Sequence, residues 1–363
     1  MEESKCGEWR PVFAMLAVDV AFAIVNILFK KVLDEGMDHL VLVIYRQAIA
    51  TVFIAPIAYY KERKTRPKVT ARIFWQLFLC ALIGATFTQY LSLLGIKYTS
   101  ATFACAFINM VPVLTFLSAL PFGLESADMK SKAGRGKVLG TVVCVGGAML
   151  LTFYKGMALT NTSHSQAMAY TSQTSSPDSH EKAHKWTIGS IMLLGACLCW
   201  SSWFLIQAKI GKAFPAPYSS TTVISFLSCL QSATLSLAIK RDISLWALKG
   251  KFRIATVIYA GMVGSGLCYV VMSWCVEKRG PVFTAAFSPV IQIVVAIIDV
   301  TLLHEQLHLG SILGSFFVIV GLYFLLWGKN LEAKNSIANQ APSMDRNECQ
   351  SLEQTRPHRT DMT

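Results

Sequence analysis

Long apolar runs separated by short polar stretches make up most of the chain. About 20 mostly apolar residues are needed for a helix to cross the hydrocarbon core of a bilayer. The runs are uniformly apolar and too long for barrel strands, so each predicts a helix that satisfies its own backbone hydrogen bonds in lipid. The sequence therefore predicts an all-α membrane protein with ten transmembrane helices. The predicted spans are Val12 to Phe29, Leu40 to Tyr59, Phe74 to Leu94, Ala101 to Leu120, Val138 to Tyr154, Ile188 to Ile206, Thr221 to Ile239, Ile254 to Cys275, Val282 to Leu303 and Leu309 to Trp327.

Composition excludes an ordinary soluble enzyme. The 363 residues are 53% hydrophobic and only 15% charged, with a mean hydropathy of +0.48, whereas soluble domains average about 25% charged residues. The net charge of +12 does not indicate a nucleic-acid partner, because the basic residues lie in short clusters between apolar runs. The expected partners are the lipid bilayer and a small-molecule substrate, and no oligomeric state follows from the sequence.

The distribution of basic residues predicts the orientation. With the N-terminus in the cytosol, the cytoplasmic segments hold 21 Lys and Arg and the opposite loops hold 11, and positive charge favours the cytoplasmic side. Both termini are therefore expected in the cytosol. The loop between Lys240 and Arg253 runs against this assignment. The first apolar run is of spanning length and no cleavage pattern precedes it, so we expect an uncleaved first helix.

The two halves of the chain resemble each other at a fixed offset. At an offset of 180 residues, Gly84 matches Gly264, Phe103 to Phe107 matches Phe283 to Phe287, and Glu125 matches Glu305. A unit of five helices crosses the membrane an odd number of times, so its second copy enters from the opposite side. The sequence thus predicts two inverted five-helix repeats, an arrangement found in many secondary transporters.

Domain boundaries follow from this repeat. We expect a cytoplasmic N-tail (1–10), a first repeat (11–155), a flexible non-cytoplasmic linker (156–187), a second repeat (188–329) and a disordered cytoplasmic tail (330–363). The linker carries a glycosylation sequon at Asn161.

Glycines recur at equivalent places in the fifth and tenth spans. At an offset of 174 they form matched sets, and their spacing puts each set on one helix face, where small residues let two backbones approach closely. We expect these glycines to serve helix packing. The two sets are Gly136, Gly140 and Gly147, and Gly310, Gly314 and Gly321.

Three formal charges lie within the predicted spans: Asp19, Arg46 and Asp299. A charge at bilayer depth costs at least ~2.5 kcal/mol, so such residues face the interior or find a partner. Two interpretations of Arg46 stay open, an internal pair with Asp19 or a backbone carbonyl, and an anchor for a substrate carboxylate. Asp19 and Asp299 are candidates for proton or charge coupling, or simply mark polar or solvated faces.

Uncharged polar and aromatic residues deep in the spans are candidates for substrate binding. Gln89 and Asn109 lie deep in the third and fourth spans, and Pro112 frees a carbonyl near Asn109, which an amide can satisfy. Trp203 is either an interfacial anchor or a cavity-lining residue. Gln207 and Gln292 complete the candidate set.

Nothing in the sequence favours an enzyme. His304 to His308 match the H-E-x-x-H pattern of zinc proteases. These residues fill a short turn, however, and no third metal ligand is evident. In addition, Glu125, the repeat equivalent of Glu305, has no flanking histidines. We interpret the match as chance and expect no catalytic residue, metal or cofactor. The cysteines within apolar runs are expected to be small packing residues.

The ten-span repeat and three segments together resemble a known family. The segments are TSATFACAFINMVP (Thr99 to Pro112), WSSWFLIQ (Trp200 to Gln207) and GPVFTAAFSP (Gly280 to Pro289). From Pro11 to Lys329 the chain resembles the plant branch of the drug/metabolite transporter superfamily. That branch contains the nodulin-like, walls-are-thin-related proteins and the "usually multiple acids move in and out" amino acid transporters, each with two EamA-type repeats.

The resemblance implies facilitated or gradient-driven transport of amino acids, or in some members of indole-type hormones. The plasma membrane is the expected location, and the vacuolar membrane is the alternative. By motif position, the polar central residues of the family correspond to Arg46, Gln89, Asn109, Trp203 and Gln207. The chain departs from some members at Asp19 and Gln292, which leaves the substrate open among amino acids, indole acids and other metabolites. A non-transporting membrane receptor or scaffold is the alternative of another class.

Overall fold

A computed structural model describes residues 2–99, 104, 107–125, 130–154, 179–239, 246, 248, 250–302, 310 and 312–332. Throughout these residues the regular structure is helical, with no strand. The predicted all-α class is therefore confirmed. Asn161, His304 to His308 and residues 333–363 lie outside the described residues. Residues 330–332 of the predicted disordered tail are helical, and residues 179–187 of the predicted flexible linker form the start of a helix, so both boundaries are wrong.

The first half contains α1 to α7. Asp38 starts α2, because its carboxylate accepts hydrogen bonds from the backbone N–H groups of Leu40 and Val41, the usual role of an N-cap aspartate. The helices are α1 (Glu2–Asp34), α2 (His39–Glu62), α3 (Ala71–Cys80), the π-helix η1 (Ala81–Phe87), α4 (Thr88–Tyr98), α6 (Val111–Ala119) and α7 (Lys132–Phe153).

The second half repeats this order. Its helices are α8 (Ser179–Ala213), α9 (Pro217–Ile239), α10 (Lys251–Tyr259), the π-helix η3 (Ala260–Leu267), α11 (Cys268–Arg279), α12 (Pro281–Ala285), α13 (Ser288–Leu302) and a C-terminal helix (Ile312–Glu332).

Seven helices of the described chain are long and apolar enough to cross a membrane. Two of them, Ala71–Tyr98 and Lys251–Arg279, are continuous rods that each contain a π-helical segment. The other three predicted spans fall in α6, in α7 and in the pair α12 and α13, which are not among the seven. The number of ten spans therefore stays a prediction.

The fourth span of each half is interrupted before a proline. In the first half, Asn109 and Met110 form a turn and α6 then begins, with Pro112 in its first turn. In the second half, Ala286 and Phe287 form the turn and α13 follows, with Pro289 as its second residue. Proline has no N–H to donate and fits the first turn of a helix, so a new helix starts at each site.

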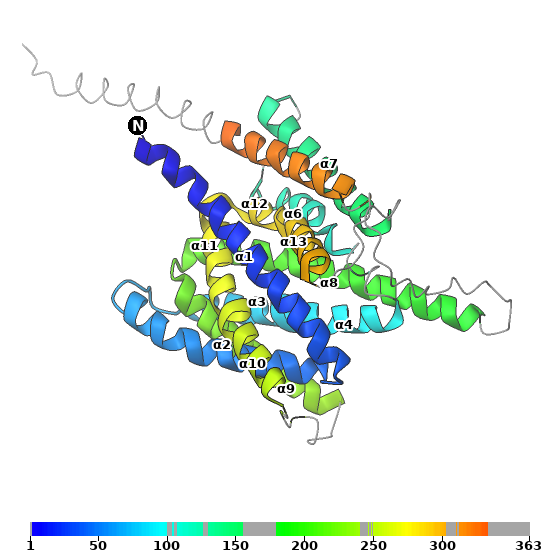
Figure 1. Cartoon of the computed structure of the whole chain (residues 1–363). Coiled ribbons are helices and arrows are strands. Elements are labelled where there is room, and N and C mark those ends of the chain that lie inside the picture. The colour runs from blue at the N-terminus through cyan, green and yellow to red at the C-terminus, as the bar shows by residue number, and fades with distance from the viewer. Residues whose placement is uncertain are drawn as a thin grey trace, which may run out of the picture.

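Helices at equivalent positions in the two halves pack side by side and antiparallel. At the end of α2, the Glu62 carboxylate accepts hydrogen bonds from the backbone N–H groups of Tyr218 and Ser219, at the start of α9, at 3.0 and 2.7 Å. Near the start of α2, the carbonyl of Ile44 accepts one from the Cys229 thiol further along α9, at 3.7 Å. The helices α2 and α9 therefore run in opposite directions, and Figure 1 shows them together at the lower side of the bundle.

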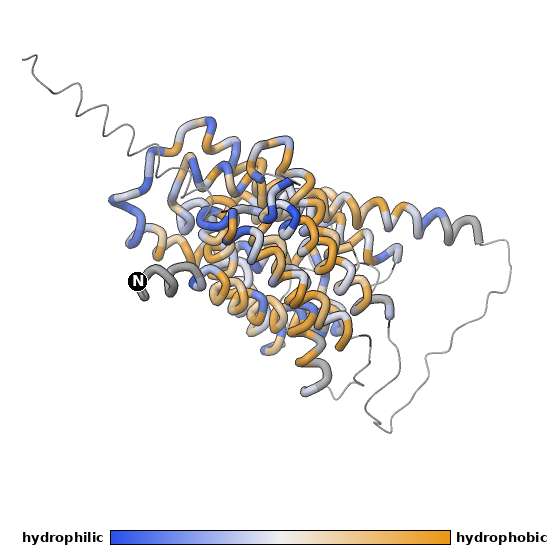
Figure 2. The backbone as a smooth tube through the Cα atoms, turned by 90° about the horizontal axis from the view of Figure 1, so that it is seen from above, coloured by the Kyte–Doolittle hydropathy of each residue, from blue (hydrophilic) through white to orange (hydrophobic). Residues whose placement is uncertain are grey.

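The outer surface of the bundle suits lipid. Large apolar side chains such as Phe13, Val52 and Ile191 are more than 60% exposed. Figure 2 shows hydrophobic residues along the bodies of the helices, with hydrophilic residues gathered at their ends and in the connections. This distribution matches a multi-pass membrane protein, in which lipid replaces water around the middle of each helix.

Candidate functional site

Arg46 lies inside the bundle without the partner that a buried cation needs. It is on α2, only 6% exposed, and its Nε and Nη2 atoms are buried with no hydrogen-bond partner. Its Cζ atom lies 5.7 Å from the centre of the Phe29 ring on α1. A cation–π contact offsets part of the desolvation of a guanidinium, but it leaves the Nε and Nη2 groups of Arg46 without a hydrogen-bond partner.

Asp19 does not pair with Arg46 in the described structure. Asp19 is 1% exposed, and its Oδ2 atom is buried without a hydrogen-bond partner. Arg46 meets α1 at Phe29, ten residues beyond Asp19, which is about 15 Å along a helix at 1.5 Å per residue. The interpretation of these two residues as an ion pair is therefore wrong for this conformation, because the contact surfaces lie at different heights on α1.

Aromatic rings of α8 and α11 form a compact cluster inside the bundle. Trp203 on α8 stacks on Trp200 with ring centres 5.2 Å apart, and the Tyr269 ring of α11 lies edge-on to Trp203 at 5.3 Å. Tyr269 also lies edge-on to Phe22 of α1, with ring centres 6.4 Å apart. The cluster therefore joins α8 and α11 of the second half to α1, the helix that Arg46 contacts at Phe29.

Gly84 makes room for this cluster. Trp203 is 1% exposed and its Nε1 atom has no hydrogen-bond partner. A Cβ atom at Gly84, in the π-helical segment η1, would lie 2.7 Å from the Trp203 Cβ, closer than real side chains approach. π-Helical segments are frequent at functional sites. The structure therefore places Trp203 inside the bundle rather than at a membrane interface.

The predicted amides do not all lie in one place. Gln207 on α8 binds protein groups at both ends of its amide: its Nε2 donates to Ser273 Oγ at 2.6 Å and its Oε1 accepts from the Cys80 thiol at 3.5 Å. Gln89 is half-buried on α4. Gln207 therefore connects α3, α8 and α11 within the bundle.

Asn109 and Gln292 come together from the two interrupted spans. The Asn109 Nδ2 donates to Gln292 Oε1 at 3.1 Å and to the carbonyl of Ala148 at 3.2 Å. Asn109 is completely buried. This contact joins the two halves beside the helix breaks, where discontinuous helices form substrate sites in many transporters. Asp299 falls in α13, and its side chain lies outside the described part of the structure.

The glycines of the fifth and tenth spans lie in one close helix contact. A Cβ at Gly140 would lie 2.7 Å from the Gly321 carbonyl oxygen, and one at Gly147 would lie 2.9 Å from that of Gly314. A Cβ at Gly136 would lie 3.0 Å from the ring of Trp327, and Gly310 is buried. Residue numbers rise along α7 as they fall along the C-terminal helix, so these two helices are also antiparallel.

Sequence reasoning missed Tyr269 and Phe29. Tyr269 is the residue 180 positions after Gln89, so the repeat offset applied to each candidate would have identified it. Phe29 has no such signal, because an apolar ring at the end of an apolar run is indistinguishable from lipid-facing residues until the packing is known.

Comparisons with known proteins agree with this architecture. The model of the EamA-like transporter family matches residues 9–153 and 187–327. One WAT1-related protein of Arabidopsis thaliana is 47% identical over 334 residues, which cover 92% of this chain and 91% of the relative. Another is 48% identical over 336 residues, covering 93% and 91%.

A solved structure gives independent support for the fold alone. It superposes with a TM-score of 0.63 at 12% identity, over 90% of this chain and 99% of its own. The two matched segments coincide with the two halves described above, and the helices are of membrane-spanning length. This chain belongs to the EamA-like transporter family, with the WAT1-related proteins of Arabidopsis among its relatives, and it is a multi-pass membrane transporter of small solutes.

Proposed function

We propose that this protein carries small organic solutes with a carboxylate group, amino acids first, and that Arg46 binds that carboxylate. The observation that carries the proposal is the buried guanidinium whose Nε and Nη2 atoms lack partners. Burial of an unpaired charge is costly, and a carboxylate fits a guanidinium with two parallel hydrogen bonds. A bound substrate would therefore complete the interactions that the protein leaves unmade.

The helix arrangement supports alternating access through two inverted five-helix repeats. Inverted repeats require helices at equivalent positions to run in opposite directions wherever they pair. The pair α2 and α9 does so, as does the pair formed by α7 and the C-terminal helix. In addition, the π-helical segments η1 and η3 both lie in the third membrane-spanning helix of their half. Arg46, Trp203 and Tyr269 lie between the halves, where a central site would open to each side in turn.

A second candidate substrate class is an indole-type acid. The stacked pair of Trp200 and Trp203 and the edge-on Tyr269 ring favour it, because aromatic rings attract one another beyond the effect of buried area. A competition panel in proteoliposomes, with amino acids and indole acids against one labelled substrate, distinguishes the two classes. A chain that moves no solute in this assay would instead be the receptor or scaffold considered from its sequence.

Substitution of Arg46 tests the proposal directly. Loss of one partner of a buried charge pair costs about 2 to 5 kcal/mol, so Arg46→Gln should weaken carboxylate binding at least about 30-fold, at 1.4 kcal/mol per factor of ten. Arg46→Lys keeps the charge but loses the planar fork and should recover binding in part. Normal affinity in folded Arg46→Gln protein would refute the role of Arg46 and direct attention to Gln89 and Asn109.

We also propose the plasma membrane as the location, with the vacuolar membrane as the alternative, and both termini in the cytosol. The described interior of the protein fits this topology: Glu62 at the end of α2 and Tyr218 at the start of α9 meet at one end of the bundle, as the predicted orientation requires. Asp19 and Asp299 stay candidates for coupling transport to a proton or ion gradient. Protease protection of the tail, or a glycan at Asn161, tests the orientation.

A further inference from the structure

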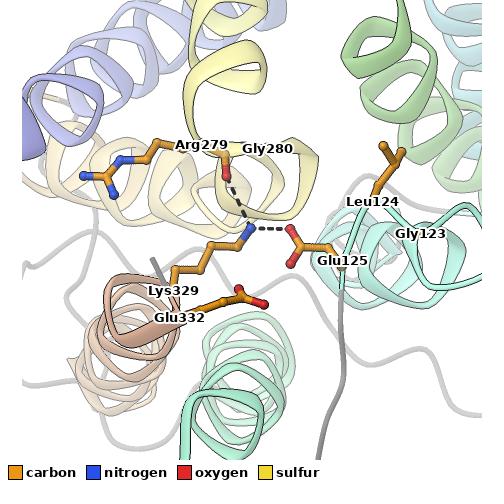
Figure 3. A pocket seen from close by; sticks show the side chains of 7 residues that line it. All are labelled: Gly123, Leu124, Glu125, Arg279, Gly280, Lys329 and Glu332. Carbon is orange, nitrogen blue, oxygen red and sulfur yellow. Dashed lines mark hydrogen bonds and ion pairs between the residues drawn. The ribbon is translucent and has the colours of Figure 1, made fainter. Parts of the chain in front are cut away.

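A network of buried charges joins the two halves at one end of the bundle. Glu125 follows α6, Lys137 is on α7, and Lys329 and Glu332 end the C-terminal helix. Lys137 Nζ lies 3.4 Å from Glu125 Oε2 and 2.8 Å from Glu332 Oε2, and Lys329 Nζ contacts Glu125 Oε1. Figure 3 shows Lys329 reaching between Glu125 and the carbonyl of Arg279. The predicted topology puts this end in the cytosol.

The network is buried although it lies at a helix end. The side chains of Glu125 and Lys137 are 3% and 1% exposed and that of Lys329 is 12% exposed, whereas Glu332, at 35%, lies at the edge of the network. Two carboxylates face two ammonium groups, so the charges balance within the network. This distinguishes the cluster from Arg46, because its charged groups bind one another.

A glycine turn of the second half also contacts this network of charges. Gly280 has φ +88°, a conformation that favours glycine, and it connects α11 to α12. The turn presents the Arg279 carbonyl to Lys329 Nζ at 3.2 Å. A recess of about 470 Å³ lies over these residues and is lined by Leu124 and Gly280 as well as by the charged groups. The first half contributes Leu124, Glu125 and Lys137, and the second half contributes Arg279, Gly280, Lys329 and Glu332.

At the opposite end of the bundle, the two halves are joined by an exposed ion pair. There, Arg253 Nε lies 3.2 Å from Glu35 Oε2, with 26% and 42% of the two side chains exposed. An exposed pair is worth at most about 1 kcal/mol, whereas removal of one partner from a buried pair leaves an uncompensated charge. Loss of one partner therefore leaves a buried charge uncompensated at the end that carries Glu125, whereas water can solvate the charge left at the other end.

We propose that Glu125, Lys137, Lys329 and Glu332 form a gate that closes this end between the two halves and opens when the halves separate. The proposal rests on the alternating access proposed above. Ionised groups suit a gate of this kind, because the open state exposes them to water, which solvates each charge separately. An apolar contact would instead pay the full hydrophobic cost of exposure. Glu125 is the central residue, since it binds a lysine from each half.

Cysteine accessibility tests the gate without any substrate. In the full-length protein with Leu124→Cys, which lines the recess, a water-soluble maleimide should react slowly while the gate is closed. Addition of Glu125→Gln should raise the labelling rate at least tenfold. The milder Glu332→Gln should raise it by a smaller factor, because Glu332 is 35% exposed and water can replace its contact with Lys137. The protein without Leu124→Cys measures labelling of the native cysteines.

Lys132→Met is the matched control. Lys132 is an exposed residue on α7, five positions before Lys137, so its replacement removes a charge from the same helix without touching the network. Labelling in this variant should equal that of the parent. Unchanged labelling in folded Glu125→Gln and Glu332→Gln proteins would overturn the gate and leave a static structural tie. Because no substrate is present, failure of the Arg46 proposal would not affect this result.

Discussion

The contact between α7 and the C-terminal helix predicts opposite effects for two glycine substitutions on the same helix. Gly140 faces the partner helix: an added Cβ would lie 2.7 Å from the Gly321 carbonyl oxygen and 2.9 Å from the Leu325 Cα, and it would also meet the Leu325 nitrogen. Gly146 faces open space, with nothing within 4 Å of an added Cβ. The variants Gly140→Ala and Gly146→Ala therefore add the same methyl group in different surroundings.

The expected magnitudes follow from these surroundings. Alanine is favoured over glycine within a helix by about 1 kcal/mol, so Gly146→Ala should leave the protein equally stable or slightly more stable. At Gly140 the neighbouring atoms belong to a backbone and cannot rotate away. The helices must separate by several tenths of an ångström, and strain of this kind costs about 1 to 3 kcal/mol. After the gain in helix propensity, Gly140→Ala should be destabilised by up to about 2 kcal/mol, and Gly140→Leu by more.

Thermal unfolding of the solubilised protein, followed by size-exclusion chromatography after heating, measures the difference. We expect a midpoint lower by a few degrees for Gly140→Ala than for Gly146→Ala, with transport in proteoliposomes reduced in the same order. Equal midpoints for the two variants would refute the close backbone contact. Undiminished flux through Gly140→Leu would further show that this contact plays no part in transport.

Three further predictions concern other parts of the bundle. Gly84→Ala should displace Trp203, because the new Cβ would lie 2.7 Å from the Cβ of the tryptophan; a shift in tryptophan fluorescence together with lost transport would show this, and an unchanged spectrum would contradict it. Glu62→Gln should lower stability by about 1 kcal/mol, since the carboxylate caps the N-terminus of α9 through Ser219, and a thermal midpoint equal to that of the parent would count against the cap. When the protein is expressed in cells that glycosylate secretory and membrane proteins, a glycan on Asn161 should slow its electrophoretic migration. A protein that carries no glycan at Asn161 would contradict the proposed orientation.

Several features of this protein follow from its sequence because they depend on short-range physics. A run of apolar residues long enough to cross a bilayer must be helical, since lipid offers no hydrogen-bond partner to the backbone. Repeated glycines such as Gly140 and Gly321 indicate close packing because spacing fixes the face of a helix, whatever its neighbours are. Arg46 is conspicuous as a lone cation within apolar runs. The family resemblance, carried by three segments, is confirmed by comparison.

The tertiary structure decided which of these groups meet. Asp19 and Arg46 are the opposite charges that sequence reasoning pairs most readily, yet Arg46 contacts α1 at Phe29, about 15 Å from Asp19. Lys137 and Lys329 read as loop cations along the chain, and only folding buries them against Glu125. A sequence fixes the face and height of a residue on its own helix, but contacts between helices depend on how the rods cross and slide. That geometry is set by the sum of many small packing energies, which no single stretch of sequence contains.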